Sequence, residues 1–281
     1  MFSFRELELS DRDWITACRD PKLHPYTSLS FTSLFTWRKA YGLTVAGDPD
    51  FFVVHSRHDR AFYGPCGDRE KSLRFMLDAA RAESGARFLY LTKDQSLALR
   101  EEGFHSLLRD DLSEYICDLD SLALREGHHA SNSYKMKVRH FLKEIPCAPR
   151  PVTRADLPLL AEIAAAAAPV KDAHDGDVLR TELDRFEELG LSGCLLETED
   201  GRRAFILGYP DIQDIFTMTM TRHEAGLPAQ VTAVLMHAFS LQLSGQYRFV
   251  NLEEDLGLAG LRRAKLLYSP VDRLNVYEAI R

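Results

Sequence analysis

The sequence predicts two α+β domains in tandem, each with a mixed central β-sheet. The chain has 281 residues, 45% of them hydrophobic, which is enough for one large core or two of ordinary size. Each half shows the same order of predicted elements: helices, an antiparallel meander, and then strand, glycine-containing loop, helix, strand, helix and strand. A basic segment followed by prolines separates the halves. We therefore place an N-terminal domain at 1–130, a basic helix and linker at 131–150, and a C-terminal domain at 151–281.

The first half opens with two predicted helices. Residues 7–20 form a short helix capped by Ser10 or Asp11, and apolar residues recur at mostly helical spacing over 28–42. Short runs rich in β-branched and aromatic residues, bounded by turn residues, then predict strands. The later elements, in order, are three meander strands, a glycine-containing loop running into a helix, a strand, a helix and a closing strand or hairpin: 43–47, 51–56, 60–65, 64–83, 87–92, 93–103 and 104–119.

The second half repeats this order. Two predicted helices, 153–167 and 177–190, precede a hairpin at 192–210 whose turn is Glu199–Asp200–Gly201. The remaining elements are a strand, a loop leading into a long apolar helix, a strand, a short helix and a final strand: 211–222, 223–243, 247–257, 258–267 and 268–280. The two halves share a pattern of elements and no visible repeat of residues.

Composition and charge narrow the class of protein. A formal charge of -7 disfavours a general binder of nucleic acid or of anionic membranes. Five scattered cysteines without a C-x-x-C pair are typical of reduced thiols, and the ten histidines form no recognisable metal set. The N-terminus lacks the regions of a signal peptide, and no apolar run reaches the roughly 18 residues of a membrane span. We expect a soluble, cytoplasmic protein with no transmembrane segment and no metal site.

The loop at 223–229 is the first candidate ligand site, because a helix start carries unpaired N–H donors that hold phosphate. The order of elements in each half resembles the GNAT acyltransferase fold, in which the acyl carrier's pyrophosphate binds at this helix start, usually at Gln/Arg-x-x-Gly-x-Gly/Ala. The resemblance implies Gly226 as a phosphate-binding residue. His223 replaces the usual Gln or Arg, and Pro228 has no N–H to donate. Pro228 as the first residue of a helix is an equally good interpretation.

Residues 251–270 concentrate charge and glycine after the strand predicted at 247–257. Alternation along this strand places Asn251 and Glu253 on one face. Polar groups between a strand end and a helix are where open α/β sheets place their sites. Arg262 and Lys265 are three residues apart and share a helix face, where they can bind a phosphate or carboxylate or pair with the acids of the strand end. The residues alone favour neither interpretation.

The same stretch resembles the signature of the family named for the phosphatidylglycerol lysyltransferase C-terminal domain, approximately Asn-x-Glu-x-Asp-Leu-Gly-x-x-Gly-Leu-Arg-x-x-Lys-x-x-Tyr-x-Pro. The matching positions are Asn251, Glu253, Asp255, Leu256, Gly257, Gly260, Leu261, Arg262, Lys265, Tyr268 and Pro270. Looser similarity at 28–42 and 62–68 extends the resemblance over most of the chain. It implies tandem GNAT-like domains. The best-known members move an aminoacyl group from aminoacyl-tRNA to a lipid head group and have a long membrane portion, which is absent from these 281 residues.

The segment between the halves is a predicted basic helix. Lys135, Arg139 and Lys143 lie at i, i+4 and i+8 and share one face, flanked by Lys137 and His140. On an acidic protein this is a local positive stripe that can meet tRNA phosphates, a CoA pyrophosphate or an acidic partner. The alternative interpretation is a solvated helix face. The stripe makes tRNA a candidate partner through residues 135–143.

Acyl transfer to an amine or hydroxyl needs a base, donors for the oxyanion and an acid for the leaving group. Our hypothesis makes Glu253 or Asp255 the base or water-orienting group and, by analogy with GNAT sites, Tyr268 the acid. The substrate or its phosphate would be held by Asn251, Arg262 and Lys265, with Gly226, Lys135 and Arg139 as further binding residues.

The hypothesis is therefore an acyl- or aminoacyl-transferase with acyl-CoA or aminoacyl-tRNA as the donor substrate and no assigned cofactor. One alternative is a catalytically silent GNAT-like module that binds tRNA, a nucleotide or a protein, which the loop at 223–229 favours. The other alternative is an acetyl-CoA-dependent N-acetyltransferase.

Overall fold

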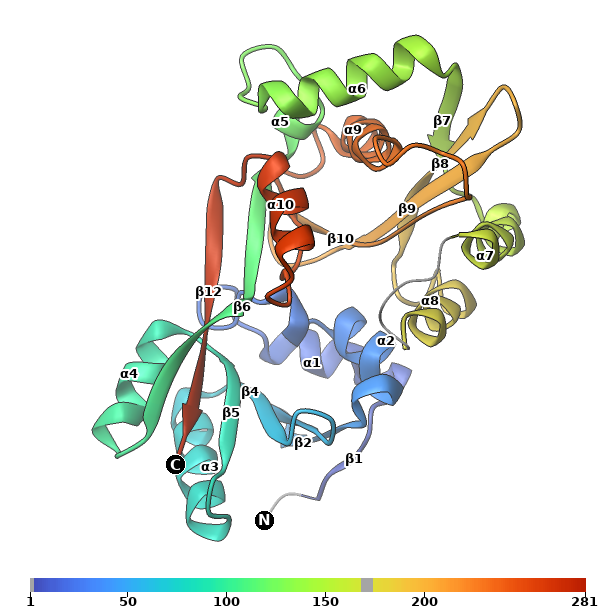
Figure 1. Cartoon of the computed structure of the whole chain (residues 1–281). Helices are drawn as coiled ribbons and strands as arrows, with labels where there is room; N and C mark the ends of the chain where they lie inside the picture. The colour runs from blue at the N-terminus through green and yellow to red at the C-terminus, as the bar shows by residue number, and fades with distance from the viewer. Residues whose placement is uncertain (1–2, 168–173) are drawn as a thin grey trace. The chain divides into compact units, whose positions relative to one another are not determined.

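The computed structural model describes residues 3–167 and 174–281. Contacts divide the chain into two compact units: Met1–Glu114 with Leu274–Arg281, and Tyr115–Arg273. The strands are connected as one mixed sheet in the order β1-β2-β3-β4-β5-β12-β6-β11-β10-β9-β8-β7, whereas the sequence predicted a separate sheet for each half. Figure 1 shows the elements along the chain.

The first unit contains a meander, two helices on the chain before it and two after it. Its elements are β1 (Arg5–Glu6), α1 (Arg12–Cys18), α2 (Phe31–Tyr41), β2 (Leu43–Asp48), β3 (Phe51–Ser56), β4 (Ala61–Gly67), α3 (Arg69–Ala82), β5 (Arg87–Leu91), α4 (Lys93–Glu101), most of β6 (His105–Asp118) and most of β12 (Asp272–Ile280).

The second unit contains the remaining elements. They are α5 (Leu119–Leu122), α6 (Asn132–Glu144), β7 (Cys147–Pro151), α7 (Leu157–Ala166), α8 (Asp175–Asp184), β8 (Ser192–Thr198), β9 (Arg203–Pro210), β10 (Ile215–His223), α9 (Val231–Leu243), β11 (Phe249–Asn251) and α10 (Ala259–Leu267).

Side-chain caps fix where several helices begin. The Ser30 hydroxyl accepts a hydrogen bond from the N–H of Ser33 at the start of α2, and Asp68 does the same for α3. Ser131 caps α6. These caps satisfy N–H groups that have no partner within the helix. The helix α2 ends at Gly42, whose φ of 58° is the left-handed conformation that glycine adopts without strain.

The last strand belongs to the first unit. In β12, Tyr277 pairs with Leu91 and Ala279 with Phe88, both in β5, in antiparallel register. The buried carboxylate of Glu278 receives hydrogen bonds from Arg87 at 2.6 Å and from Arg109 at 3.0 Å. The boundaries predicted at 130 and 150 differ from the observed division, because the residues of a strand do not specify which sheet it will join.

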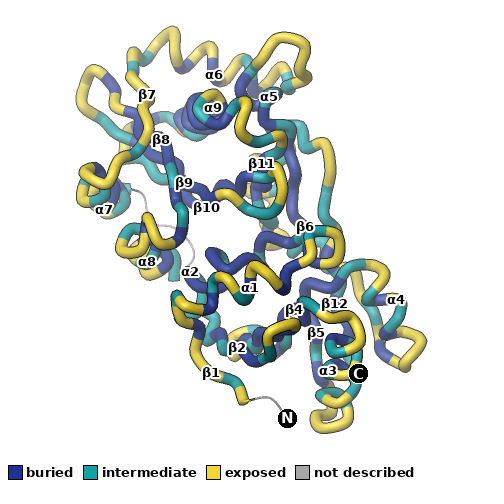
Figure 2. Tube along the Cα trace, turned by 180° about the vertical axis from the view of Figure 1, so that it is seen from behind, coloured by how far each residue is buried: buried dark blue, intermediate teal, exposed yellow. Residues whose placement is uncertain are grey.

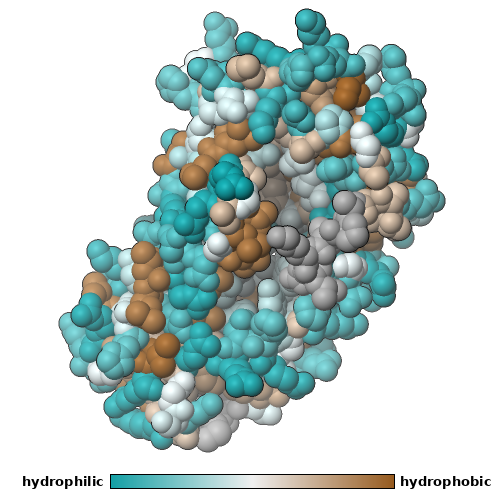
Figure 3. Space-filling view, viewed as in Figure 1, coloured by the Kyte–Doolittle hydropathy of each residue, from teal (hydrophilic) through white to brown (hydrophobic). Residues whose placement is uncertain are grey.

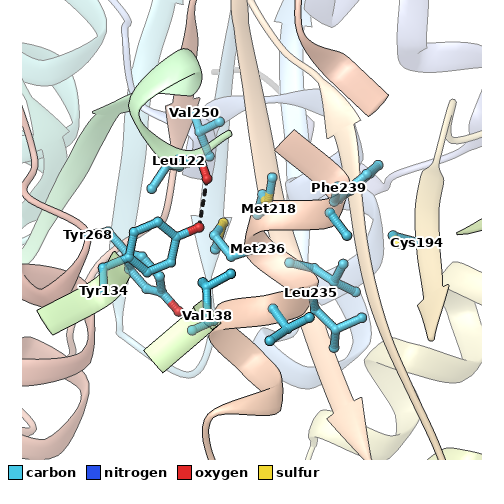
Figure 4. Close-up of a cluster of buried hydrophobic side chains, with 14 of the residues drawn as sticks. Leu122, Tyr134, Val138, Cys194, Met218, Leu235, Met236, Phe239, Val250 and Tyr268 are labelled. Carbon is cyan, nitrogen blue, oxygen red and sulfur yellow. Dashed lines mark hydrogen bonds between the residues drawn. The ribbon is translucent and has the colours of Figure 1, made fainter. Parts of the chain in front are cut away.

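The core of the second unit surrounds α9. This helix is largely apolar and has nine buried residues, so most of its surface packs against other elements. It lies between α6 and the face of the sheet formed by β7, β8 and β9, while α7 packs on β9 and β10 from the other side (Figure 1). Tyr134, Val138 and Phe141 of α6 complete the cluster, and the Tyr134 hydroxyl donates a hydrogen bond to the carbonyl oxygen of Leu122 at 2.7 Å (Figure 4).

Candidate functional site in the second unit

Two parallel strands of the second unit separate after a short pairing. β10 pairs with β11 at three positions, the last being Thr217 with Asn251. β11 ends at Asn251, whereas β10 continues to His223. The register of β10 against its other neighbour, β9, shifts between Met218 and Met220, which marks a β-bulge. The bulge bends β10 where the parallel partner ends. Among the described residues no strand pairs with this edge of β10 beyond Thr217, so the edge is open there, on the strand that leads to the helix start of α9.

Several hydrogen-bonding groups of the loop between β10 and α9 are already paired with other groups of the protein. Gly226 has a φ of 88°, and its carbonyl oxygen accepts a hydrogen bond from Arg202 at 2.5 Å. The N–H of Leu227 donates to Glu224, and the N–H of Val231 donates to Pro228 at 2.9 Å. Pro228 itself offers no donor. Fewer N–H groups are thus available for a phosphate than a helix start normally provides.

The carboxylate of Asp255 is the centre of the signature stretch. It is fully buried and accepts hydrogen bonds from the Tyr115 hydroxyl at 2.5 Å and from the N–H of Gly257 at 2.8 Å. Arg262 of α10 donates to both carboxylate oxygens, at 2.7 and 3.1 Å. Burial alone raises the pKa of Asp255, but the hydrogen bonds from Arg262, Tyr115 and Gly257 outweigh it and lower the pKa to about 2. Asp255 is therefore ionised and bound on several sides at neutral pH.

Lys265 and Arg273 surround the same tyrosine. The Lys265 ammonium donates hydrogen bonds to the carbonyl oxygens of Leu252 and Glu254, and its nitrogen lies 6.0 Å from the centre of the Tyr115 ring. The Arg273 guanidinium lies 5.0 Å from that ring centre. Arg262 and Lys265, which the sequence predicted as binding residues, thus stabilise the turn after β11. The sequence did not predict Tyr115 and Arg273 as members of this cluster. Tyr115 is 140 residues away from Asp255 along the chain, so no local pattern connects the two.

Asn251 and Glu253 lie where the two parallel strands part. Asn251 is buried, and its side-chain oxygen accepts a hydrogen bond from the N–H of Glu253 at 2.7 Å. Glu253 has a φ of 61°, a left-handed conformation that is uncommon for a residue other than glycine. Such strain is found where the surroundings hold it in place, often at functional sites. Glu253 therefore remains a candidate for contact with a substrate.

Tyr268 lies in the hydrophobic core of the second unit. Its ring packs edge-on against Tyr134, with ring centres 5.3 Å apart (Figure 4). Burial raises the pKa of the Tyr268 hydroxyl. The structure thus gives Tyr268 a packing role, and the acid role predicted for it is not part of our proposal.

The helix α10 is held mainly by polar contacts. None of its residues is buried, and the leucines in and just before it, Leu258, Leu261 and Leu266, are 43%, 40% and 54% exposed. Apolar side chains accordingly gather at the surface over α10 in Figure 3. The hydrogen bonds of Arg262 and Lys265 anchor this helix to the turn before it.

The basic stripe of α6 is on the surface. Tyr134, Val138 and Phe141 are buried, whereas Lys137, Arg139 and Lys143 are exposed and Lys135 is half-buried. Much of α6 is accordingly drawn as exposed in Figure 2. Within residues 3–167 and 174–281, no carboxylate forms an ion pair with these four cations, while His140 lies 3.3 Å from Glu144. Because α6 packs on α9, the stripe belongs to the same layer as the helix that starts beside the open strand edge.

A buried acid on α8 was not singled out by the sequence. Glu182 is only 2% exposed, and its side-chain oxygen Oε2 has no hydrogen-bond partner. Burial raises the pKa of Glu182 to about 8, while the nearby Thr219 hydroxyl lowers it slightly. Thr219 occupies the bulge of β10, between Met218 and Met220. Only its burial distinguishes Glu182 from the other acids of the helix predicted at 177–190, so no sequence signal could have revealed it.

Two kinds of feature are absent from the described part of the chain. Over residues 3–167 and 174–281, no helix is both long and apolar enough to cross a membrane. The same residues contain no group of three or more histidines, cysteines or carboxylates that could hold a metal ion.

Solved structures share the fold over essentially the whole chain. A conserved protein of unknown function from Bacteroides thetaiotaomicron is 26% identical, with a TM-score of 0.86 and coverage of 100% of this chain and 99% of that one. L-PGS from Bacillus licheniformis is 14% identical, with a TM-score of 0.62 and coverage of 90% and 92%. A tandem GNAT protein from the clavulanic acid biosynthesis pathway is 11% identical, with a TM-score of 0.51 and coverage of 100% and 98%.

The similarity of the fold to that of a tandem GNAT protein agrees with the open edge of β10 and with the two units described above. No curated protein matches the chain by sequence. A family model does match, over residues 21–280, and this range includes most of both units and the whole of the signature stretch. The chain belongs to the family of the phosphatidylglycerol lysyltransferase C-terminal domain.

Proposed function

We propose that this protein transfers an aminoacyl group from aminoacyl-tRNA to an acceptor, at the open edge of β10 in the second unit. The observation that carries the proposal is the separation of β10 from β11 after three paired residues, with a bulge at that point. The family and the tandem GNAT likeness support a transferase. Because aminoacyl-tRNA is a cytoplasmic substrate, the proposal also places the protein in the cytoplasm.

Two observations favour aminoacyl-tRNA over acyl-CoA as the donor. The loop before α9 contains Pro228, which has no N–H, and the N–H groups of Leu227 and Val231 donate to carbonyl oxygens of the same loop. Fewer donors are therefore left to bind a pyrophosphate. The helix α6 exposes the cations Lys137, Arg139 and Lys143, and cations of this kind bind a phosphate backbone. Lys135 and Arg139 are the members of the stripe that we assign to tRNA first.

The residues of the signature divide into two roles in this proposal. Asp255, Arg262 and Lys265 hold the turn after β11. Asn251 and Glu253 come from the strand end and meet the substrate, with Glu253 as the proton acceptor. A proton acceptor needs to be within hydrogen-bond reach of the group that it serves, and the left-handed backbone at Glu253 is held by the Asn251 side chain.

Transfer can be measured with bulk tRNA charged with labelled amino acids. We expect loss of label from tRNA and its appearance in a product that depends on the protein. Glu253→Gln should reduce the transfer rate by about 100-fold while tRNA binding is retained. Glu254→Gln is the matched control, because Glu254 is the next residue and uses its carbonyl oxygen, which the substitution keeps, to bind Lys265.

The alternatives predict other results. Thermal stabilisation by CoA or acetyl-CoA, together with acetyl transfer, would identify an acetyl-CoA-dependent N-acetyltransferase. Stabilisation by charged tRNA without transfer to any acceptor would identify a silent binding module, which the bonds within the loop at 223–229 favour. Normal transfer by Glu253→Gln would remove Glu253 from the site.

A further inference from the structure

The carboxyl group of Glu182 is buried without a charged partner. Two other acids on the elements around it lie close to arginines. Asp175 of the same helix forms an ion pair with Arg222 of β10, and Glu162 of α7 lies 3.9 Å from Arg203. Burial is the main influence on the pKa of the Glu182 carboxyl, and no cation within residues 3–167 and 174–281 contributes to that pKa. At neutral pH it is therefore largely a neutral carboxylic acid.

The hydroxyl of Thr219 is a second buried polar atom without a hydrogen-bond partner. It comes from the bulge of β10, and among the described residues Thr219 is the side chain that affects the pKa of the Glu182 carboxyl. No hydrogen bond of standard geometry joins the two groups. Buried polar groups are nearly always satisfied, so two neighbouring exceptions at the point where parallel strands separate require an explanation.

We propose that Glu182 and Thr219 form a binding subsite for a primary ammonium group of a substrate. An ammonium has three N–H donors and fits a carboxylate oxygen and a hydroxyl oxygen at once. When the ammonium binds, the Glu182 carboxylic acid releases its proton to solvent and becomes the carboxylate partner of the cation. Charge is conserved, and no bond within the ligand changes.

Which ligand carries the ammonium group depends on the proposed function. Two sources share this chemistry in aminoacyl transfer: the amino group of the aminoacyl donor and the amine of an acceptor. Small probes represent each source. Alanine methyl ester stands for the donor and ethanolamine for the acceptor, and methyl lactate and ethylene glycol are their neutral analogues with a hydroxyl in place of the amine.

Isothermal titration calorimetry at pH 7, in two buffers of different ionisation enthalpy, measures both affinity and proton release. We expect one of the two amines to bind at least about tenfold more tightly than its neutral analogue and to release about one proton. Whichever amine shows this behaviour identifies the source. Equal binding of amine and neutral analogue, or binding without proton release, overturns the proposal. These comparisons use the unmodified protein.

Variants assign the effect to the two residues. Glu182→Gln keeps the size of the side chain and cannot ionise, so it should lose both the proton release and the preference for amines. Thr219→Val should weaken amine binding several-fold with proton release retained. Asp184→Asn on the exposed side of the same helix is the control and should behave as the unmodified protein. Retained proton release in Glu182→Gln overturns the assignment.

The transfer assay separates this inference from the proposed function. Amine-specific binding with proton release in a protein that transfers nothing leaves the subsite in place and rejects the proposed function. Aminoacyl transfer that is unchanged in Glu182→Gln, in a protein without amine-specific binding, rejects the subsite and retains the proposed function.

Discussion

At the scale of single residues, the carboxylate of Asp255 connects three segments that are distant in the sequence. It receives hydrogen bonds from Tyr115 of β6, from the turn at Gly257 and from Arg262 of α10. A family signature is commonly taken to describe a catalytic site. Here several of its polar residues bind one another, and their arrangement sets the backbone of Glu253 in its left-handed conformation.

Asp255→Ala should destabilise the second unit by about 2 kcal/mol, because the Tyr115 hydroxyl and Arg262 lose a buried acceptor. The pKa of Asp255 is lowered from 3.8 to about 2, so its contribution to stability is present above pH 3.8 and is lost as the pH falls through 2. Urea unfolding from pH 6 to pH 2 should show the difference between the two proteins shrinking toward acid. A difference that is constant with pH would contradict this account.

Glu182 should show the opposite dependence on pH. Burial raises its pKa from 4.5 to about 8, so the folded protein holds this proton more tightly than the unfolded chain does. The contribution of Glu182 to stability is therefore fully present below pH 4.5 and is lost as the pH rises through 8, with a slope of at most about 1.4 kcal/mol per pH unit.

Glu182→Gln removes this titration, so the variant should gain stability relative to the unmodified protein between pH 5 and pH 8. Urea unfolding at several pH values measures the difference, and Asp184→Asn provides the control on the same helix. Parallel curves for Glu182→Gln and the unmodified protein would show that the acid titrates normally.

At the scale of elements, the exposed cations of α6 should govern binding of tRNA. Lys137→Ala, Arg139→Ala and Lys143→Ala are each expected to weaken binding and to lower the slope of log K against log salt by about 0.7 to 0.9 for every phosphate that the variant no longer binds. Filter binding at several salt concentrations measures both quantities. Arg81→Ala is a suitable control, because Arg81 is exposed on α3 and paired with Asp78. Unchanged slopes would exclude α6 as the tRNA surface.

Most elements could be predicted from local patterns. Helical spacing over 28–42 corresponds to α2, and the hairpin at 192–210 is confirmed by the pairing of β8 with β9. β7 was interpreted as a linker because of its prolines. It pairs only with β8 at the end of the sheet, and proline is tolerated in such an edge strand. α8 ends at Asp184, earlier than the Gly190 stop signal indicated.

The candidate site was harder to predict than the elements. The charged residues of the signature were found, because they are concentrated in twenty residues. Their partner Tyr115 and the unpaired Glu182 were not, because hydrogen bonding across distant segments and burial are properties of the folded chain. The open edge of β10 likewise depends on where β11 stops, and the alternating pattern of 247–257 continues past Asn251.

At the scale of the whole molecule, the first unit depends on residues at the far end of the chain. Residues Leu274–Arg281 lie in this unit, and β12 lies between β5 and β6 in the sheet. Val276 and Ala279 are fully buried, and Glu278 binds two arginines.

Removal of residues 274–281 should therefore unfold the first unit in preference to the second. Hydrogen exchange should show loss of protection in β4 and β5, whereas β9 and β10 keep theirs. Removal of Arg281 alone, an exposed residue, is the control. Protection that persists in β5 without β12 would show that the first unit closes its sheet by itself.

The placement of β12 also has a consequence during protein synthesis. Residues 1–114 are synthesised before residues 115–273, but their sheet lacks the strand between β5 and β6 until β12 (Asp272–Ile280) has been made. Throughout synthesis of 115–273, the nascent chain thus presents two unpaired strand edges. The first unit can therefore complete its sheet only after the residues of the second unit have been synthesised, although most of its own residues precede them in the chain.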